Sequence, residues 1–525
     1  MEREYVVVVK KGINISEVDT QLASSAGDST IPNRPCECAN PLSHSDRMTH
    51  WMLTDEEAQL LRGDERVLNI EIPLKDLTGV ELRPTARQNS VFDKTSTASG
   101  VNWGLSRCSS ATNNFGEGVD TVTENYMYAL DGEGIDVVIM DSGIEKNHPE
   151  FQDRNGTSRI KEIDWFSESN GAVSGTQGAN HYTDTDGHGT FCAAITAGKT
   201  YGWAKGADIY VSKIFDTDKM EVTEAMDTLL AWHNNKGTGR PTVVNMSFGY
   251  FYDTDEGTKT NDTGLHYNDS TGQMDAWTFG DAGYETTSDV SYKVNVPHVT
   301  KMSLRLSQID ARVDNLVAAG VHVVIAAGNN YDVQYNDTVT ANDHYNDSMT
   351  RPNFNGNSPC YYHRGASPRT TDNGDAVVVG NISSALISGQ EQPSNSSGRG
   401  PAIDIWAPGS YITSAISNSH SFPTAALYPD DNNYKIGNST GTSFAAPQYA
   451  GLTAMYLQLF PSLTPAQLKE KIISDSKTDL IYDISANLYD STSKYQYVFA
   501  GALFGSPNKM MFNRFLGDVL VRRGY

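Results

Sequence analysis

The stretch "DVVIMDSGIEKNHPEF" (residues 136–151) joins a run of apolar residues to a polar turn. The uninterrupted apolar run from Val137 to Met140 is typical of a strand that is buried on both faces of a sheet. Asp141 follows directly, and the Ser142-Gly143 pair after it is turn-like. Because reactive groups in open parallel sheets gather at the carboxyl ends of strands, Asp141 is a candidate functional residue.

Similar apolar runs recur along the chain and alternate with helical segments. Strands are expected at residues 135–140, 209–215, 243–247, 321–327, 377–382 and 403–406. Helices are expected at residues 222–232 and 304–318, and a further helix begins at Thr464-Pro465. Buried strands that alternate with helices predict an α/β fold class, in which a mostly parallel sheet carries helices on both faces.

The N-terminal residues predict a separate, small α+β unit. The segment "EYVVVVKKG" (residues 4–12) is rich in β-branched residues, as strands are. Thr54 and Glu57 match a helix capping box, and residues 67–72 alternate like a strand. We therefore expect a domain at residues 1–86, followed by a polar linker at residues 87–100.

The rest of the chain is expected to form one large domain at residues 101–500 and a C-terminal extension at residues 501–525. Two segments of this domain, residues 250–300 and 330–366, are rich in Asp, Asn, Thr, Gly and Tyr. Asn and Asp supply turn chemistry, so these segments are expected to be insertions made of surface loops or small β additions.

The composition excludes several kinds of partner. The 525 residues include 40 Lys and Arg against 64 Asp and Glu, which gives a formal net charge of -24. A surface this acidic repels phosphate backbones, so nucleic acid is not an expected partner. No apolar run approaches the roughly 18 residues of a membrane span, so no membrane contact is expected either. The start of the sequence lacks a signal-peptide pattern, which favours a cytoplasmic or virion-associated location over ordinary secretion.

Three further stretches place one polar residue among small ones. They are "DTDGHGTFCAAITAG" (residues 184–198) with His188, "VHVVIAAGNN" (residues 321–330) with Asn329, and "GNSTGTSFAAPQYAG" (residues 437–451) with Ser443. A serine hydroxyl becomes a nucleophile when a histidine takes its proton, and a carboxylate holds that histidine in the right tautomer. An asparagine side chain can donate to the oxyanion of the intermediate. Each residue alone could be an ordinary turn or core residue, but together with Asp141 they supply every group that acyl transfer needs.

Five short blocks, "MDSGI", "GHGTFCA", "NMSFG", "AAGN" and "GTSFAAP", resemble in sequence and order those of the subtilases, the subtilisin-like serine proteases. The chain order Asp, His, Ser is also that of subtilisins. The resemblance extends over about residues 130–475, and "GKTYGWAKGADIYVSKIFD" (residues 198–216) is most similar to the proteinase K-like branch. A subtilisin-like fold is therefore implied.

The resemblance implies a role for each polar residue. Asp141 would orient His188, which would act first as general base and then as general acid. Ser443 would be the nucleophile, and Asn329 would donate to the oxyanion together with the backbone N–H of Ser443.

Two further segments match the substrate-binding parts of the family. The segment Ser247-Phe248-Gly249 would pair with an extended substrate strand, which explains why such enzymes cleave flexible segments. The segment Ala326-Ala327-Gly328 would form a wall of the primary specificity pocket.

The proteinase K-like branch also binds calcium, through an aspartate that precedes an aromatic residue and "PG". Asp404 in "AIDIWAPG" (residues 402–409) matches this pattern, and the accompanying carbonyl donors would lie near Gly374 and Ala376. Calcium prefers such oxygen ligands. Asp404 could equally be a strand-end hydrogen-bond acceptor. The calcium ion would be structural, since the chemistry itself requires no cofactor.

The N-terminal unit, from "YVVVVK" to "RVLNIEI", resembles the inhibitory prodomain of subtilases. Such prodomains assist folding and occupy the cleft until they are cut away. Here the cut would fall between about Leu74 and Ser99.

The expected function is a serine endopeptidase that is made as a zymogen and processes its own prodomain. Its partners would be a polypeptide substrate and the prodomain as inhibitor. Two alternatives stay open at this point. One is a structural, virion-type component that carries a protease domain and belongs to a large assembly. The other is an inactive binding module on the protease scaffold.

Overall fold

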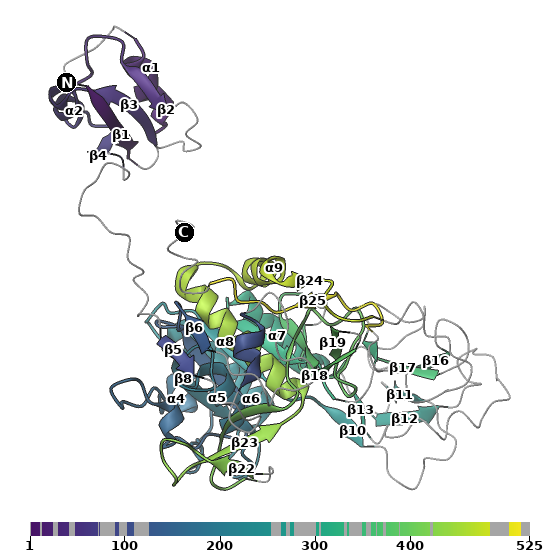
Figure 1. Cartoon of the computed structure of the whole chain (residues 1–525). Helices are drawn as coiled ribbons and strands as arrows, with labels where there is room; N and C mark the ends of the chain where they lie inside the picture. Colours follow the sequence, from purple (N-terminus) through teal and green to yellow (C-terminus); the bar gives the residue numbers. More distant parts are fainter. Residues whose placement is uncertain are drawn as a thin grey trace. The chain divides into compact units, whose positions relative to one another are not determined.

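The computed structural model divides the chain into two compact units, Met1–Arg83 and Pro84–Tyr525, which are described separately. It describes residues 2–10, 13–24, 30–40, 48–71, 73, 90–93, 102–109, 125–253, 264–268, 273–277, 301–303, 306–329, 333–334, 349–352, 359–363, 365–370, 374–387, 389–420, 424–483 and 503–515. Figure 1 shows both units and labels many of their elements.

The N-terminal unit contains an antiparallel sheet with the strand order β2-β3-β1-β4. Its elements are β1 (Arg3–Val9), α1 (Ile15–Leu22), β2 (Glu37–Asn40), β3 (Met48–Leu53), α2 (Asp55–Leu61) and β4 (Val67–Glu71). The capping box at the start of α2 is confirmed, because Thr54 Oγ1 accepts from the Glu57 N–H and Glu57 Oε2 accepts from the Thr54 N–H. The unit has a core of its own, in which Val7, Trp51 and Leu53 are buried.

The second unit is built on a mostly parallel sheet, which confirms the expected fold class. Its strand order is β24-β25-β20-β18-β14-β9-β7-β8, and β19 pairs with β18. The strands are β7 (Asp136–Asp141), β8 (Asp208–Lys213), β9 (Thr242–Met246), β14 (His322–Ala326), β18 (Val377–Ile387), β19 (Gln390–Pro393), β20 (Ile405–Pro408), β24 (Lys477–Thr478) and β25 (Lys509–Met510). The six strands from β20 to β8 run parallel to their neighbours.

Helices pack on both faces of this sheet. They are α3 (Trp103–Arg107), α4 (Trp165–Glu168), α5 (His188–Ala197), α6 (Val222–Asn235), α7 (Ser307–Ala318), α8 (Thr442–Leu459) and α9 (Pro465–Asp475). Alternate residues of β7 enter opposite cores: Val137 and Ile139 join the core that contains α5 and α8, whereas Val138 and Met140 join the core that contains α6 and α7. This is why the sequence of β7 is apolar without interruption.

The boundaries of the second unit differ from the expected ones at both ends. Residues 90–93 of the expected linker form β5 (Ser90–Asp93), which pairs antiparallel with β6 (Asn125–Tyr128). The described part of the expected C-terminal extension is also integrated, because β25 pairs with β20 and with β24. Met510, Met511 and Phe515 are buried in the larger of the two cores. Removing these residues would therefore open the core.

Short β ladders make up the remaining described strands of this unit. They are β10 (Phe251–Asp253) with β13 (Lys301–Ser303), β11 (Gly264–Asn268) with β12 (Gln273–Trp277), β15 (Val333–Gln334) and β16 (Met349–Pro352) with β17 (Pro359–His363), and β21 (Ile412–Ile416) and β22 (Thr424–Leu427) with β23 (Lys435–Ser439). The first three of these ladders lie largely in the two expected insertions, so the described parts of the insertions are small β additions.

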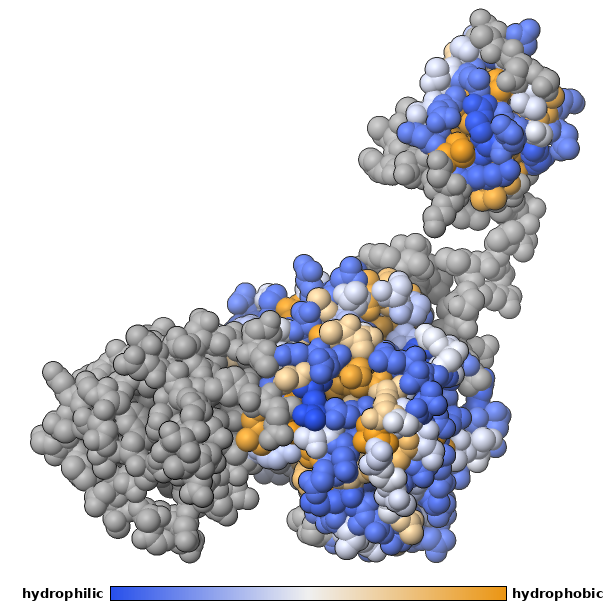
Figure 2. All heavy atoms as spheres, turned by 180° about the vertical axis from the view of Figure 1, so that it is seen from behind, coloured by the Kyte–Doolittle hydropathy of each residue, from blue (hydrophilic) through white to orange (hydrophobic). Residues whose placement is uncertain are grey.

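The described surface is predominantly polar on the side shown in Figure 2, with smaller apolar patches among the polar residues. Of the described helices, none combines the length and the apolar character that crossing a membrane requires.

Candidate active site

Asp141 and His188 are brought together by two neighbouring elements. Asp141 is the last residue of β7, and His188 is the first residue of α5. The Nδ1 atom of His188 lies 2.8 Å from Oδ1 and 3.0 Å from Oδ2 of Asp141. The Asp141 side chain is fully buried, whereas the side chain of His188 is 21% exposed. The buried Asp141 carboxylate thus holds the imidazole at its Nδ1 atom, while another part of the His188 side chain remains exposed to solvent.

Two glycines flank His188 because the backbone leaves no room for a side chain there. Gly187 has a φ of 97°, in the left-handed region that favours glycine. A Cβ atom on Gly189 would lie 2.3 Å from the carbonyl oxygen of Gly143, the residue two positions after Asp141. The "GHG" pattern therefore lets α5 begin directly against the end of β7.

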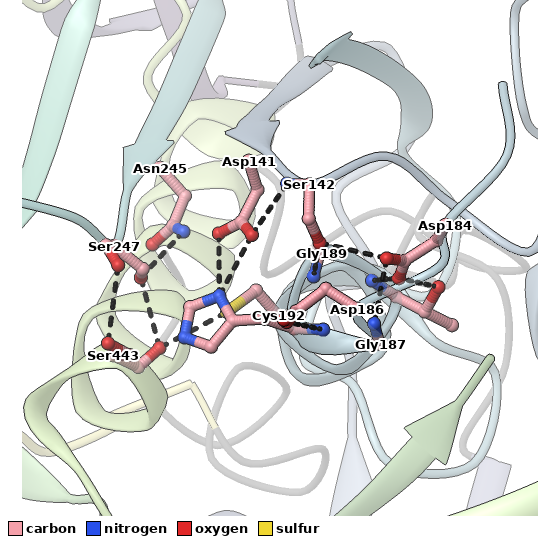
Figure 3. A network of polar contacts seen from close by, with 12 residues as sticks. Asp141, Ser142, Asp184, Asp186, Gly187, Gly189, Cys192, Asn245, Ser247 and Ser443 are labelled. Atoms are coloured by element: carbon pink, nitrogen blue, oxygen red, sulfur yellow. Dashed lines mark hydrogen bonds and ion pairs between the residues drawn. The ribbon is translucent and has the colours of Figure 1, made fainter. Parts of the chain in front are cut away.

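The sequence did not single out Asp184, although this residue anchors the start of α5. Its carboxylate is buried and accepts hydrogen bonds from the Gly187 N–H (2.8 Å), the Thr190 N–H (2.9 Å) and the Ser142 hydroxyl (2.9 Å). The Thr190 hydroxyl donates to the same carboxylate. Ser142 in turn accepts from the Gly189 N–H (2.9 Å), so both sides of His188 are fixed (Figure 3). The only sequence signal was the polar "DTDG" stretch before His188.

The electrostatics of His188 favour its charged form. Burial lowers the pKa of the imidazole, but the neighbouring Asp141 carboxylate raises it, and the net result is a pKa well above the ordinary value. Beside the ring, the buried Cys192 has its Sγ 3.7 Å from His188 Nδ1 and 3.3 Å from the carbonyl oxygen of Ser443. Burial raises the pKa of this thiol, so Cys192 is a neutral packing group next to the site.

Ser443 lies in the first turn of α8, where backbone N–H groups have no partner within the helix. Among the described residues, the N–H of Ser443 has no acceptor. Its hydroxyl donates to the Ser247 carbonyl oxygen at 3.2 Å, and the Ser247 hydroxyl donates to the Ser443 carbonyl oxygen at 3.0 Å. The end of β9 is thereby tied to the start of α8, as Figure 3 shows.

Thr442 fixes the orientation of Asn329. The Asn329 carboxamide oxygen accepts from the Thr442 N–H at 2.9 Å and from the Thr442 hydroxyl at 3.1 Å. Because a backbone N–H needs an acceptor, this contact assigns the oxygen and points the Nδ2 donor elsewhere. In the part of the chain that the structure describes, Nδ2 has no acceptor, so it is available to a ligand. The role of Thr442 was not predicted.

The two predicted substrate-binding segments border these residues. The segment Ser247-Phe248-Gly249 directly follows β9, and the backbone groups of Phe248 and Gly249 lack hydrogen-bond partners among the described residues. The segment Ala326-Ala327-Gly328 is firmly held, since the Ala327 N–H donates to Val379 (3.0 Å) and the Gly328 N–H donates to Thr442 Oγ1 (3.1 Å). One segment thus offers free backbone groups, and the other forms a fixed wall.

At Asp404 the structure assembles the expected oxygens around a different cation. The Nζ of Lys469, on α9, lies 2.8 Å from Asp404 Oδ1, 2.8 Å from the Gly374 carbonyl oxygen and 2.9 Å from the Ala376 carbonyl oxygen. These are the three oxygens from which a calcium site was expected. Because the ammonium group already uses them, the residues do not fit a calcium ion as they stand. The expectation of calcium at Asp404 is therefore corrected to an ion pair.

The sequence of this chain is similar to those of known proteins. The model of the subtilase family matches residues 132–497. Subtilisin-like protease 8 of Trichophyton verrucosum is 27% identical over 409 residues, which cover 75% of this chain and 60% of that protein. The extracellular serine proteinase of a Thermus species is 24% identical over 461 residues, covering 88% of this chain and 74% of that protein. Among solved structures, a cold adapted subtilisin-like serine proteinase covers 78% of this chain and 98% of its own, with 20% identity and a TM-score of 0.45.

The family match extends over more than half of the chain. The chain belongs to the subtilase family. It spans less than two thirds of the length of the Trichophyton relative, at 60%.

Proposed function

We propose that this chain hydrolyses peptide bonds with Asp141, His188 and Ser443 as its catalytic residues. The observation that carries the proposal is the contact of His188 Nδ1 with Asp141 at 2.8 Å. This contact places the proton on Nδ1 and leaves Nε2 as the basic nitrogen. His188 is therefore oriented with Nε2 as the nitrogen that can accept a proton, as a general base requires.

Ser443 would attack the carbonyl carbon of the substrate after a rotation about its own Cα–Cβ bond. The hydroxyl donates to Ser247 in the present structure and would turn to donate to His188 Nε2. As the bond to the substrate carbon forms, the serine proton passes to His188 and the carbonyl oxygen becomes an oxyanion. Collapse of this intermediate expels the amine, which takes the proton from His188 and leaves an acyl-enzyme. Water then repeats the sequence and releases the acid.

The oxyanion would be stabilised by two donors that the fold holds in place. One is the N–H of Ser443 in the first turn of α8, and the other is Nδ2 of Asn329. Because Thr442 holds the oxygen of the Asn329 carboxamide, the donor needs no reorganisation as charge develops. The raised pKa of His188 supports the same step, since it favours the imidazolium that forms beside the oxyanion.

The substrate would be an extended polypeptide segment. The free backbone groups of Phe248 and Gly249 can form hydrogen bonds with an extended substrate strand. Such pairing recognises the main chain of the substrate rather than a particular side chain.

We further propose that the first substrate is the chain itself. The N-terminal unit has its own sheet and core, as a prodomain inhibitor would. The cut would fall between about Leu74 and Ser99, a segment that lies almost wholly outside the described residues.

The test is the intact mass of the purified chain over time, for the wild type, for Ser443→Ala and for the control Ser419→Ala at an exposed serine. We expect the wild type and the control to lose an N-terminal fragment that ends between Leu74 and Ser99, and Ser443→Ala to stay whole. Peptide hydrolysis by Ser443→Ala at the wild-type rate would contradict the catalytic assignment. Peptide hydrolysis without N-terminal loss would contradict only self-processing.

A further inference from the structure

The three hydrogens of the Lys469 ammonium group face three oxygens. These are Oδ1 of Asp404 and the carbonyl oxygens of Gly374 and Ala376, at 2.8, 2.8 and 2.9 Å. A lysine has three N–H donors and no acceptor, so each donor has its own partner in this arrangement. The group is closely enclosed: the side chains of Lys469 and Asp404 are 14% and 23% exposed.

The site joins three parts of the fold. Lys469 belongs to α9, Gly374 and Ala376 precede β18, and Asp404 precedes β20. The second oxygen of Asp404 accepts from the Val378 N–H at 2.8 Å, and the Asp404 N–H donates to the Val378 carbonyl oxygen at 3.0 Å. A single cation at this point therefore ties a helix to the starts of two paired strands.

The charges at the site match an ammonium group better than a divalent ion. One carboxylate balances one lysine, whereas calcium would leave an excess positive charge and would require about six to eight oxygen ligands at 2.3–2.6 Å. A calcium ion added to the present arrangement would also lie against the ammonium group, because both would need the same oxygens.

We propose that Lys469 takes the structural place of a divalent cation in this chain, so that the junction of α9, β18 and β20 is held without metal. We call the three oxygens, Asp404 Oδ1 and the carbonyl oxygens of Gly374 and Ala376, the cation cradle. The cation that it binds is the ammonium group of Lys469, a residue of the chain itself. The junction then keeps its strength where free calcium is scarce. This inference concerns stability and does not depend on the proposed catalytic residues.

The test uses the full chain with Ser443→Ala, called the inactive parent, so that self-digestion does not affect the readout. The thermal unfolding midpoint is measured in EDTA and in millimolar calcium chloride, with magnesium chloride as the salt control. Lys469→Met removes the ammonium group but keeps an apolar stem, and Lys469→Ala makes room for an ion. Lys471→Ala is the matched control on the same helix, because its ion pair with Asp475 is longer, at 3.7 Å.

In EDTA we expect Lys469→Met and Lys469→Ala to lower the midpoint by about 3–8 °C, and Lys471→Ala to change it by about 1 °C at most. Calcium should restore part of the loss in Lys469→Ala, and the further change Asp404→Asn should abolish that recovery. Asp404→Asn alone should leave the difference between EDTA and calcium the same as in the inactive parent.

Three results would overturn the proposal. The first is an unchanged midpoint in EDTA for both lysine variants. The second is an Asp404→Asn protein that loses a calcium-dependent part of the stability of the inactive parent, because Asp404 would then hold an ion in the native chain. The third is a Lys469→Ala protein that calcium does not restore, because the three oxygens would then not form a cation cradle.

Discussion

Asp184→Asn tests whether the start of α5 is held by one buried carboxylate. Asp184 is 3% exposed and accepts from the Gly187 N–H, the Thr190 N–H and the hydroxyls of Ser142 and Thr190. An asparagine has the same shape but only one accepting oxygen. If this oxygen faces Gly187 and Ser142, the new amide group faces the Thr190 N–H, and two donors then oppose each other.

The cost follows from these contacts. A hydrogen bond to a charged group contributes about 1.5–3 kcal/mol, and a buried N–H without an acceptor costs about 1–3 kcal/mol. The hydroxyl of Thr190 can rotate to accept from the new amide, so the main loss is the bond from the Thr190 N–H together with the charge. We therefore expect Asp184→Asn to lower the free energy of unfolding by about 3 kcal/mol. Because His188 begins the loosened helix, kcat should fall by about 10- to 100-fold.

Stability is measured by urea unfolding of the inactive parent with and without Asp184→Asn, and kcat is measured on a peptide substrate in the active chain. The control is Asp216→Asn, since Asp216 is exposed and accepts only from the Thr185 hydroxyl, at 2.8 Å, among the described contacts. If Asp184→Asn matched Asp216→Asn in both stability and kcat, the anchoring role of this carboxylate would be refuted.

Four further predictions concern the site and the core. Asn329→Ala should lower kcat by about 10²–10³-fold with little change in KM, as steady-state kinetics would measure, and an unchanged kcat would exclude Asn329 from the oxyanion site. The raised pKa of His188 places the acid limb of kcat/KM above the ordinary histidine pKa of about 6.5, and a pH profile with its limb below that value would contradict the Asp141 contact. In the inactive parent, the same raised pKa adds stability that is fully present below pH ~6.5 and is lost as the pH rises through the folded pKa; Asp141→Asn should flatten this trend in urea unfolding. Phe515→Ala should lower the free energy of unfolding by about 3–5 kcal/mol, because Phe515 is 5% exposed in the larger core; a loss below ~1 kcal/mol would show that this terminal segment is not part of the core.

The parts of the fold that could be predicted are those that a pattern of neighbouring residues in the sequence specifies. The uninterrupted apolar run of β7 predicted a central strand, and the structure buries all six of its residues. Thr54 and Glu57 predicted a capping box from two residues three positions apart, and both hydrogen bonds are present. In each case the partners are close in sequence or the burial pattern is repeated along one element.

The parts that were missed depend on contacts between distant residues. Strand β25 has only two residues, too few to show a strand pattern in the sequence. It forms because it pairs with β20, which is distant in the sequence. No element was predicted between the first strand and Thr54, where the structure has the helix α1 and where β2 and β3 complete the N-terminal sheet. Lys469 follows the buried Leu468 on an amphipathic helix, but its partner Asp404 lies on another part of the chain, so the sequence suggested a metal where the structure has a lysine.

At the site, the residue types and their order predicted the contact between Asp141 and His188, and Asp141 at the end of a strand does contact His188 at the start of a helix. The Ser443 hydroxyl donates to the Ser247 carbonyl oxygen instead. The residues that position the start of α5 and Asn329 were not predicted. Asp184 and Thr442 are ordinary turn-like residues in the sequence, and only their hydrogen bonds to the start of α5 and to Asn329 distinguish them.

The central claim is that Ser443 is a nucleophile activated by His188. The most direct measurement is reaction with a fluorophosphonate, followed by mass mapping of the modified peptide and by the rate of modification in His188→Ala. We predict one adduct, on Ser443, and a strong loss of the rate when His188 is replaced by alanine. An adduct on another serine, or none on a chain that remains folded, would contradict the claim.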